Sequence, residues 1–123
     1  MSDLPASFRA YVVDKPADGA FSRGLREFDT RDLPPGEVTV RVAWSSVNFK
    51  DGLAARADGR VARSYPLIPG IDLAGTVVAS DDPAFAVGSE VLANGYDIGV
   101  ARHGGYGELA RSRMAWAVPQ PAA

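Results

Sequence analysis

The sequence predicts a mainly β fold, a closed or nearly closed β-barrel with one or two short helices. Short segments of alternating apolar residues recur along the chain, and almost none of it has helical features. The 123 residues include 13 Gly and 9 Pro, more than is usual for a globular protein. We therefore expect many tight turns between short strands, with closure of the sheet removing exposed strand edges.

The first half of the chain is predicted to hold three strands and then a short helix. Prolines and glycines separate these elements, because proline removes a backbone donor and glycine permits turn geometry. The expected strands are residues 8–13, 25–28 and 38–44, and the expected helix is residues 48–56. Asn48 would cap that helix, and Asp51 would place a negative charge in its first turn.

The third strand has the clearest period of two, which predicts one buried face. Thr39 and Arg41 lie on the opposite face and are expected to meet solvent. The expected core face carries four apolar side chains: Val38, Val40, Val42 and Trp44.

The second half is predicted to begin with an extended loop, because each residue before a proline is pushed out of the helical region. Strands follow at residues 73–80, 89–93, 105–111 and 115–118. Gly70 and Gly75 are expected to allow close backbone approach and positive φ. Asp72, which lies between them in the sequence, is expected to accept hydrogen bonds from backbone or side-chain groups. Further core residues are expected at Phe85, Val87, Val91 and Trp116.

Composition argues against several classes of function. With no Cys and a single histidine, His103, the chain cannot form disulfides, thiolate nucleophiles or a zinc site built from Cys or several His ligands. A net charge of −2, from 13 basic and 15 acidic side chains, is too small to favour nucleic acid or an anionic membrane. Without a signal-like N-terminus or a long apolar segment, a cytoplasmic protein is expected.

Four motifs occur in order along the chain. They are Trp44-Ser-Ser-Val-Asn-Phe-Lys-Asp51, Tyr65-Pro-Leu-Ile-Pro-Gly-Ile-Asp-Leu-Ala-Gly-Thr-Val77, Phe85-x-x-Gly-x-x-Val91 and Gly95-Tyr-Asp-Ile-Gly-Val-x-x-His-Gly-Gly-Tyr-Gly-Glu108. Together they resemble the zinc-independent quinone oxidoreductase and acryloyl-CoA reductase branch of the medium-chain dehydrogenase/reductase superfamily. The resemblance spans nearly the whole chain, and the order of the motifs makes it specific.

The resemblance implies that residues 1–123 form a GroES-like domain, the substrate side of an enzyme whose Rossmann domain binds NADPH. The chain has no Gly-x-Gly-x-x-Gly fingerprint between a strand and a helix, so we expect no NADPH binding by this chain alone. The implied partners are a small-molecule substrate and that Rossmann domain. Self-association into a homo-oligomer would cover the apolar surface that faces the second domain.

The resemblance also implies a metal-free site at the start of the predicted helix. The places of the zinc ligands in zinc-dependent relatives correspond to Asn48 and to Gly70-Ile-Asp72, which supply neither Cys nor His. Asn48, Lys50 and Asp51 are the catalytic candidates. Asn48 and Asp51, three positions apart, would share one side of the helix start and position cofactor and substrate. Lys50 would stabilise an enolate or donate a proton. The alternative is that Asn48 and Asp51 only stabilise the helix start and Lys50 is a solvated side chain.

Substrate-binding candidates come from three places in the sequence: Phe49, Tyr65, His103 and Tyr106. The family branch often has Tyr at the place of Phe49, so a proton-donor role cannot be carried over to that position. His103, beside two glycines, has the alternative of a partly exposed loop residue. A loop with Arg56, Arg60 and Arg63 would either meet an anionic substrate such as a CoA phosphate or simply be solvated.

Two functions are compatible with these residues. The first is reduction of an α,β-unsaturated carbonyl or thioester such as acryloyl-CoA, or of a quinone, by hydride transfer from NADPH. The second is a stand-alone GroES-like interaction or assembly module without catalysis. A third reading, a decayed gene product, has no positive signal in the sequence. A Gly-rich βαβ unit encoded downstream of Ala123 would favour the enzyme.

Overall fold

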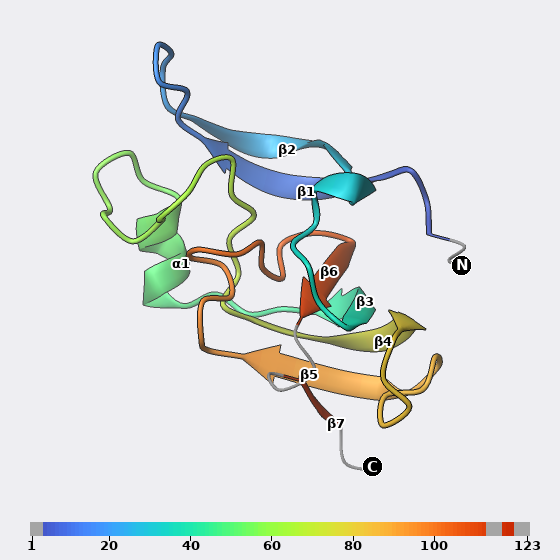
Figure 1. The fold of residues 1–123 in the computed structure, drawn as a ribbon. Helices are drawn as coiled ribbons and strands as arrows, with labels where there is room; N and C mark the ends of the chain where they lie inside the picture. The colour runs from blue at the N-terminus through green and yellow to red at the C-terminus, as the bar shows by residue number, and fades with distance from the viewer. Residues whose placement is uncertain (1–3, 113–116, 120–123) are drawn as a thin grey trace.

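The protein is mainly β, as predicted, with seven strands and two short helices in the part of the chain that the structure describes (Figure 1). This computed structural model describes residues 4–112 and the backbone of 117–119. The elements, in chain order, are β1 (Ser7–Asp14), β2 (Ser22–Asp29), the 3-10 helix η1 (Thr30–Asp32), β3 (Val38–Trp44), α1 (Phe49–Ala54), β4 (Asp72–Ser80), β5 (Glu90–Asn94), β6 (Leu109–Ser112) and β7 (Ala117–Pro119).

The strands form two antiparallel sheets. β1 and β2 make a hairpin in which Ser7 lies opposite Asp29 and Asp14 opposite Ser22. The other five strands have the order β6-β3-β4-β5-β7. In Figure 1 the hairpin lies above this sheet, with α1 at one end of the molecule and η1 at the other.

A short stretch before β6 joins the two sheets through backbone hydrogen bonds. Tyr11 N–H donates to the Tyr106 carbonyl (2.8 Å), and Glu108 N–H donates to the Arg9 carbonyl (3.0 Å). On the other side, Val42 N–H donates to the Glu108 carbonyl (2.9 Å). These bonds link the two sheets, so of the two expected forms, a closed or a nearly closed barrel, the described strands do not form the closed one.

Two apolar clusters make up the core. The first lies on the five-stranded sheet and contains Val38, Val40, Leu73, Val77, Phe85, Val91, Ala93, Ile98 and Ala110. The second lies beneath the hairpin and contains Phe8, Ala10, Val12, Phe28, Leu33, Ile68 and Leu109. The predicted burial of Phe85 and Val91 is confirmed, whereas Trp116 lies outside the described residues.

The alternation predicted for β3 holds only over its first half. Val38 and Val40 are buried, but Trp44 is 74% exposed, so its predicted place in the core is wrong. Thr39 is also buried, contrary to prediction, and its Oγ1 accepts a hydrogen bond from Arg111 Nε at 2.8 Å. The cause is two register shifts between β3 and β4, which break the strict period of two.

Two further predictions are corrected. Val87 is 66% exposed, so Phe85 alone of these two apolar side chains is buried in the connection between β4 and β5. Gly70 has the expected positive φ of 102°, but Gly75 does not share it, because it lies within the regular strand β4. The expected close approach at Gly75 is confirmed, since a Cβ there would lie 2.1 Å from the Arg41 carbonyl oxygen.

Candidate active site

The Asp72 carboxylate, at the first residue of β4, organises the segment between β3 and α1. Ser46 donates its backbone N–H (3.1 Å) and its hydroxyl (2.7 Å) to Oδ1, and its hydroxyl also lies 2.6 Å from Oδ2. Ser45 donates its hydroxyl to the Asp72 carbonyl (3.0 Å). The expectation that Asp72 accepts hydrogen bonds is confirmed, and these bonds fix the chain that leads into α1.

Asp51 is a second carboxylate in the same region and is only 2% exposed. Its Oδ2 accepts the backbone N–H of Asn48, the N-cap residue of α1, at 3.0 Å. Its Oδ1 accepts the backbone N–H of Ile71 at 2.9 Å. Asp51 therefore ties the start of the helix to the loop that precedes β4.

The Asn48 side-chain amide lies between these two carboxylates. Its Nδ2 donates toward Asp51 Oδ2 (3.1 Å), Asp72 Oδ2 (3.2 Å) and Ser46 Oγ (3.2 Å). The prediction that Asn48 and Asp51 share one side of the helix start is confirmed. Because an amide nitrogen has two hydrogens and here meets three acceptors, its orientation is fixed by the protein itself. We call Ser46, Asn48, Asp51 and Asp72 the polar cluster.

Tyr106 closes the polar cluster from the stretch that links the sheets. Its hydroxyl donates to the Ser46 carbonyl at 2.9 Å. Burial and, after it, the neighbouring carboxylates of Asp51 and Asp72 together raise the pKa of Tyr106 to about 12. Tyr106 thus keeps its proton at neutral pH.

Glycines make the approach of Tyr106 to the polar cluster sterically feasible. A Cβ at Gly70 would lie 2.8 Å from the backbone nitrogen of Gly105 and 2.9 Å from that of Tyr106. Gly105 N–H donates to the Gly70 carbonyl at 2.9 Å. Only residues without a side chain let the two backbone segments lie this close.

Exposed apolar side chains border the polar cluster. Trp44, Val47 and Phe49 are 74%, 89% and 84% exposed, and all three belong to the segment that carries Ser46 and Asn48. Lys50 is exposed in the first turn of α1. A shallow groove beside them is lined by Trp44, Ser45, Ser46, Asp72, Leu73, Ala74, Leu92, Ala93 and Asn94.

His103 and Tyr65, two of the predicted substrate-binding residues, do not join the polar cluster. His103 Nδ1 accepts the backbone N–H of Ile68 at 3.1 Å, and its ring meets the Phe28 ring edge-on at 4.8 Å. Burial lowers the pKa of His103, with a further lowering by Arg102 opposed by Asp32. These contacts put His103 beneath the hairpin instead of in the polar cluster. Tyr65 is half-buried in the loop before β4 and precedes a cis peptide bond to Pro66.

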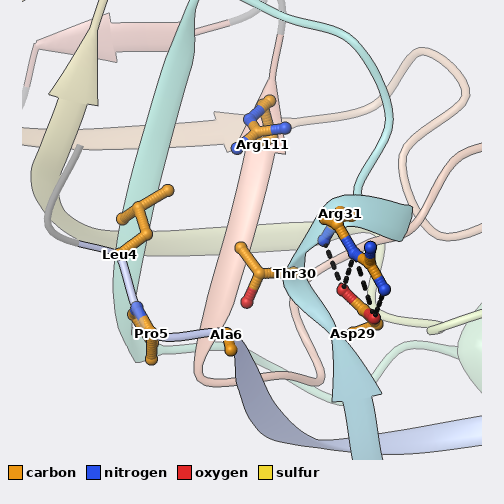
Figure 2. A pocket seen from close by; sticks show the side chains of 7 residues that line it. All are labelled: Leu4, Pro5, Ala6, Asp29, Thr30, Arg31 and Arg111. Atoms are coloured by element: carbon orange, nitrogen blue, oxygen red, sulfur yellow. Dashed lines mark hydrogen bonds and ion pairs between the residues drawn. The ribbon is translucent and has the colours of Figure 1, made fainter. Parts of the chain in front are cut away.

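A separate hollow lies beside η1 and the segment before β1 (Figure 2). Its lining residues are Leu4, Pro5, Ala6, Asp29, Thr30, Arg31 and Arg111, none of which was predicted as a site residue. Arg31 pairs with Asp29 at 2.8 Å and, mainly by hydrogen bonding, lowers the pKa of that carboxyl to about 2. Thr30 Oγ1 is buried without a hydrogen-bond partner among the described residues. In Figure 1 this region lies at the opposite end of the molecule from α1.

Within residues 4–112 and 117–119, no group of three or more acidic or histidine side chains is placed to hold a metal ion. The same part of the chain contains no helix that is long and apolar enough to cross a membrane.

The arrangement of strands and the loop–helix segment at the polar cluster define a known class of domain. Residues 34–122 match the alcohol dehydrogenase GroES-like domain, and the chain belongs to this family. The acrylyl-CoA reductase AcuI of Ruegeria pomeroyi is 44% identical over 115 residues, which are 93% of this chain and 35% of that protein. The chain thus spans about a third of the length of the curated relatives that it matches.

Other relatives and solved structures agree with this placement. YhfP of Bacillus subtilis, whose name assigns it provisionally as a quinone oxidoreductase, is 49% identical over 114 residues, 93% of this chain and 34% of that protein. Its crystal structure with NAD bound has a TM-score of 0.88 and covers 95% of this chain and 35% of that one. The yhdH oxidoreductase of Salmonella enterica, solved with NADP, has a TM-score of 0.87 at 44% identity, covering 93% and 35%.

Sequence reasoning missed the part that Ser46 plays and underrated Asp72. The sequence predicts that Asp72 accepts hydrogen bonds but does not identify the donors, which are Ser46 and Asn48. A signal was present in the run Ser45-Ser46-Val47-Asn48, because small hydroxyl residues before a helix cap commonly hydrogen-bond nearby groups. The distance of 24 residues between Asn48 and Asp72 hid their pairing.

Proposed function

We propose that this chain is the substrate-side domain of an NADPH-dependent oxidoreductase that reduces an α,β-unsaturated carbonyl or thioester, or a quinone. The observation that carries this proposal is the Asn48 amide held between Asp51 and Asp72 beside exposed apolar side chains. The names of the relatives support the reaction class, since they include acrylyl-CoA reductase and quinone oxidoreductase.

The residues present fit one end of a nicotinamide dinucleotide. Trp44, Val47 and Phe49 offer an exposed apolar surface next to the polar cluster, which suits a flat ring with a polar substituent. Within the described residues, α1 follows Ser45–Asn48 and not a glycine-rich turn, so this chain lacks the usual cradle for a pyrophosphate. We infer that a second domain holds the remainder of the cofactor.

The polar cluster would act electrostatically. NADPH, when bound, supplies a hydride, and its ring gains positive charge as the hydride leaves. The carboxylates of Asp51 and Asp72 would stabilise that developing charge from fixed positions, which is the most effective form of electrostatic catalysis. Asn48 would hold both carboxylates in place, Phe49 and Val47 would exclude water, and Lys50 would approach the negative charge that forms on the substrate oxygen.

The test is substrate-dependent oxidation of NADPH, followed by absorbance, by a polypeptide that contains this domain together with a dinucleotide-binding domain. We expect turnover with acryloyl-CoA, a small enone or a quinone. The rate should be the same after exhaustive dialysis against a chelator, because the chain has no Cys and only one His with which to bind zinc. Absence of turnover with all three substrate classes would refute the proposal. Loss of activity on chelation that zinc restores would refute its metal-free part.

The exposed apolar side chains also support a second candidate, an interaction module. Trp44, Val47 and Phe49 would then contact a partner protein instead of a cofactor ring. The two candidates differ in one variant, Asp72→Asn, which leaves the apolar surface intact but removes a charge of the polar cluster. A module would keep its partner binding, whereas the proposed enzyme would lose turnover.

A further inference from the structure

The strand β2 is one edge of the two-stranded sheet and carries an exposed apolar side chain near its middle. Among the described residues it pairs only with β1, and in Figure 1 it lies on the side of β1 that faces away from the five-stranded sheet. Leu25 is 67% exposed, and the exposed side chains of Arg23 and Glu27 flank it on the same face of the strand. We propose that this edge binds the same edge of a second copy of this chain, in a two-fold symmetric antiparallel pair.

The free edge of β2 presents backbone groups with which no other described backbone group pairs. Leu25 lies opposite Tyr11 of β1. The Tyr11 N–H donates to the Tyr106 carbonyl at 2.8 Å and so points away from β2, which makes Leu25 and Tyr11 a non-hydrogen-bonded pair. In such a pair both residues direct their N–H and C=O outward, so Leu25 exposes both groups at the free edge. Arg23 and Glu27, two positions away on either side, do the same.

The side chains of β2 favour one register for the pair. Outward-directed residues must face outward-directed residues, so the register can change only in steps of two residues. With Leu25 opposite Leu25 of the second copy, Arg23 faces Glu27, and the two-fold axis repeats this opposite-charge pair. A shift in one direction brings like charges together at Arg26, and a shift in the other places Gly24 at the axis without any opposite-charge pair within β2. Charges on an edge strand often prevent pairing, but here their order is self-complementary in the Leu25-centred register.

Both charged side chains keep groups available for the second copy. Arg23 donates from Nη1 to the Ala55 carbonyl at 2.7 Å, and its guanidinium has further N–H donors. Glu27 accepts the Ser7 hydroxyl at Oε1, 2.7 Å away, and its carboxylate has a second oxygen that can accept as well. Because these bonds already restrict the two side chains, less rotamer freedom is lost when they pair. The overlap is short, so we expect a reversible dimer with a dissociation constant on the order of 100 µM.

Disulfide trapping tests the register directly, because the chain has no Cys of its own. Facing residues in a hydrogen-bonded antiparallel pair have Cα atoms about 5.5 Å apart, which a disulfide can span. With oxidised glutathione as the oxidant, Leu25→Cys should form a disulfide-linked dimer, measured by non-reducing electrophoresis. Val87→Cys, at a side chain that is 66% exposed but lies away from β2, is the matched control and should form about tenfold less dimer. Equal amounts from the two variants, or no dimer from Leu25→Cys, would overturn the proposal.

Charge exchange tests the two expected ion pairs. Arg23→Glu places like charges together at both ends of the pair and should raise the dissociation constant, measured by sedimentation equilibrium, about tenfold. The double variant Arg23→Glu with Glu27→Arg exchanges the charges and should return the constant to within about threefold of its original value. Lys15→Glu makes the same change of net charge at an exposed residue of the hairpin turn and should shift it less than about twofold. An unchanged constant in Arg23→Glu, or no recovery in the double variant, would overturn the proposal.

Self-association through another surface would give a different result. The exposed side chains Trp44, Val47 and Phe49 offer such a surface. Association through them would be unaffected by Arg23→Glu and would not favour a disulfide at residue 25, and this outcome would overturn the assignment to β2. A chain that stays monomeric up to about 1 mM would overturn the proposal as a whole. Because β2 contributes no residue to the polar cluster, either result leaves the proposed reductase to its own test by NADPH oxidation.

Discussion

Asp51 is a buried carboxylate whose two oxygens serve different parts of the chain: Oδ2 holds the start of α1 and Oδ1 holds Ile71. In Asp51→Asn, either orientation of the amide would point an N–H group at a backbone N–H group. We expect a loss of about 2–3 kcal/mol in the free energy of unfolding, measured by urea denaturation. Asp58→Asn, at an exposed carboxylate, is the control and should cost less than about 0.5 kcal/mol. Equal losses in the two variants would contradict the assigned network.

Tyr106 gives the polar cluster a signature in alkaline titration. Its pKa is raised to about 12, above the ordinary value of 10, because partial burial and the nearby carboxylates of Asp51 and Asp72 disfavour the charged phenolate. A raised pKa in the folded state means that the phenol stabilises the fold fully below pH 10 and loses this contribution as the pH rises toward 12. Absorbance of tyrosinate should show a component with a midpoint near pH 12 that Tyr106→Phe removes. A variant with an unchanged titration curve would contradict the placement.

At the scale of single elements, two glycines that look alike in the sequence should respond in opposite ways to Ala. Gly75 lies in β4, where a Cβ would meet the Arg41 carbonyl oxygen at 2.1 Å, so Gly75→Ala should cost at least about 2 kcal/mol. Gly52 lies in α1 with nothing within 4 Å of its Cβ position, so Gly52→Ala should gain about 0.5–1 kcal/mol. Urea denaturation of both variants measures the difference, and a loss at Gly52 would contradict the helix.

Local sequence patterns were sufficient to predict most of the strands and the helix α1. The turns predicted at Pro and Gly residues gave the strand bounds to within a few residues. The cap predicted at Asn48 gave the start of α1, which ends at Ala54 and not at Arg56. The exposure of Trp44 could not be predicted, because it depends on how β3 pairs with β4 and the register shifts between them. The 3-10 helix η1 was missed for a different reason, because it has only three residues, too few to show a periodic pattern in the sequence.

The candidate site was predictable to the same extent. Asn48 and Asp51 are neighbours on one helix start, so sequence spacing alone brings them together. Asp72 and Tyr106 join them through the fold, across 24 residues in one case and 60 residues to Ser46 in the other. His103 was a substrate-binding candidate because it precedes Gly104, Gly105 and Tyr106, but its Nδ1 accepts the backbone N–H of Ile68 beneath the hairpin.

On the scale of the whole molecule, the chain should not bind NADPH without a partner domain. The described residues lack a glycine-rich turn before a helix, and contacts to the nicotinamide alone must offset the entropy lost on association. The exposed side chains Trp44, Val47 and Phe49 make self-association the expected way of covering this surface. Fluorescence titration with NADPH and light scattering test both expectations. Saturable micromolar binding, or a strictly monomeric chain, would contradict the corresponding one.

The polar cluster is proposed to take part in hydride transfer and not merely to cap α1. The most direct test is kcat for NADPH oxidation by Asn48→Ala in a protein that also contains the dinucleotide-binding domain, at a temperature where denaturation curves show both variants folded. Loss of a preorganised electrostatic contact of about 3 kcal/mol predicts a fall in kcat of about 100-fold. A kcat equal to that of the unsubstituted protein, with only a lower melting temperature, would contradict the claim.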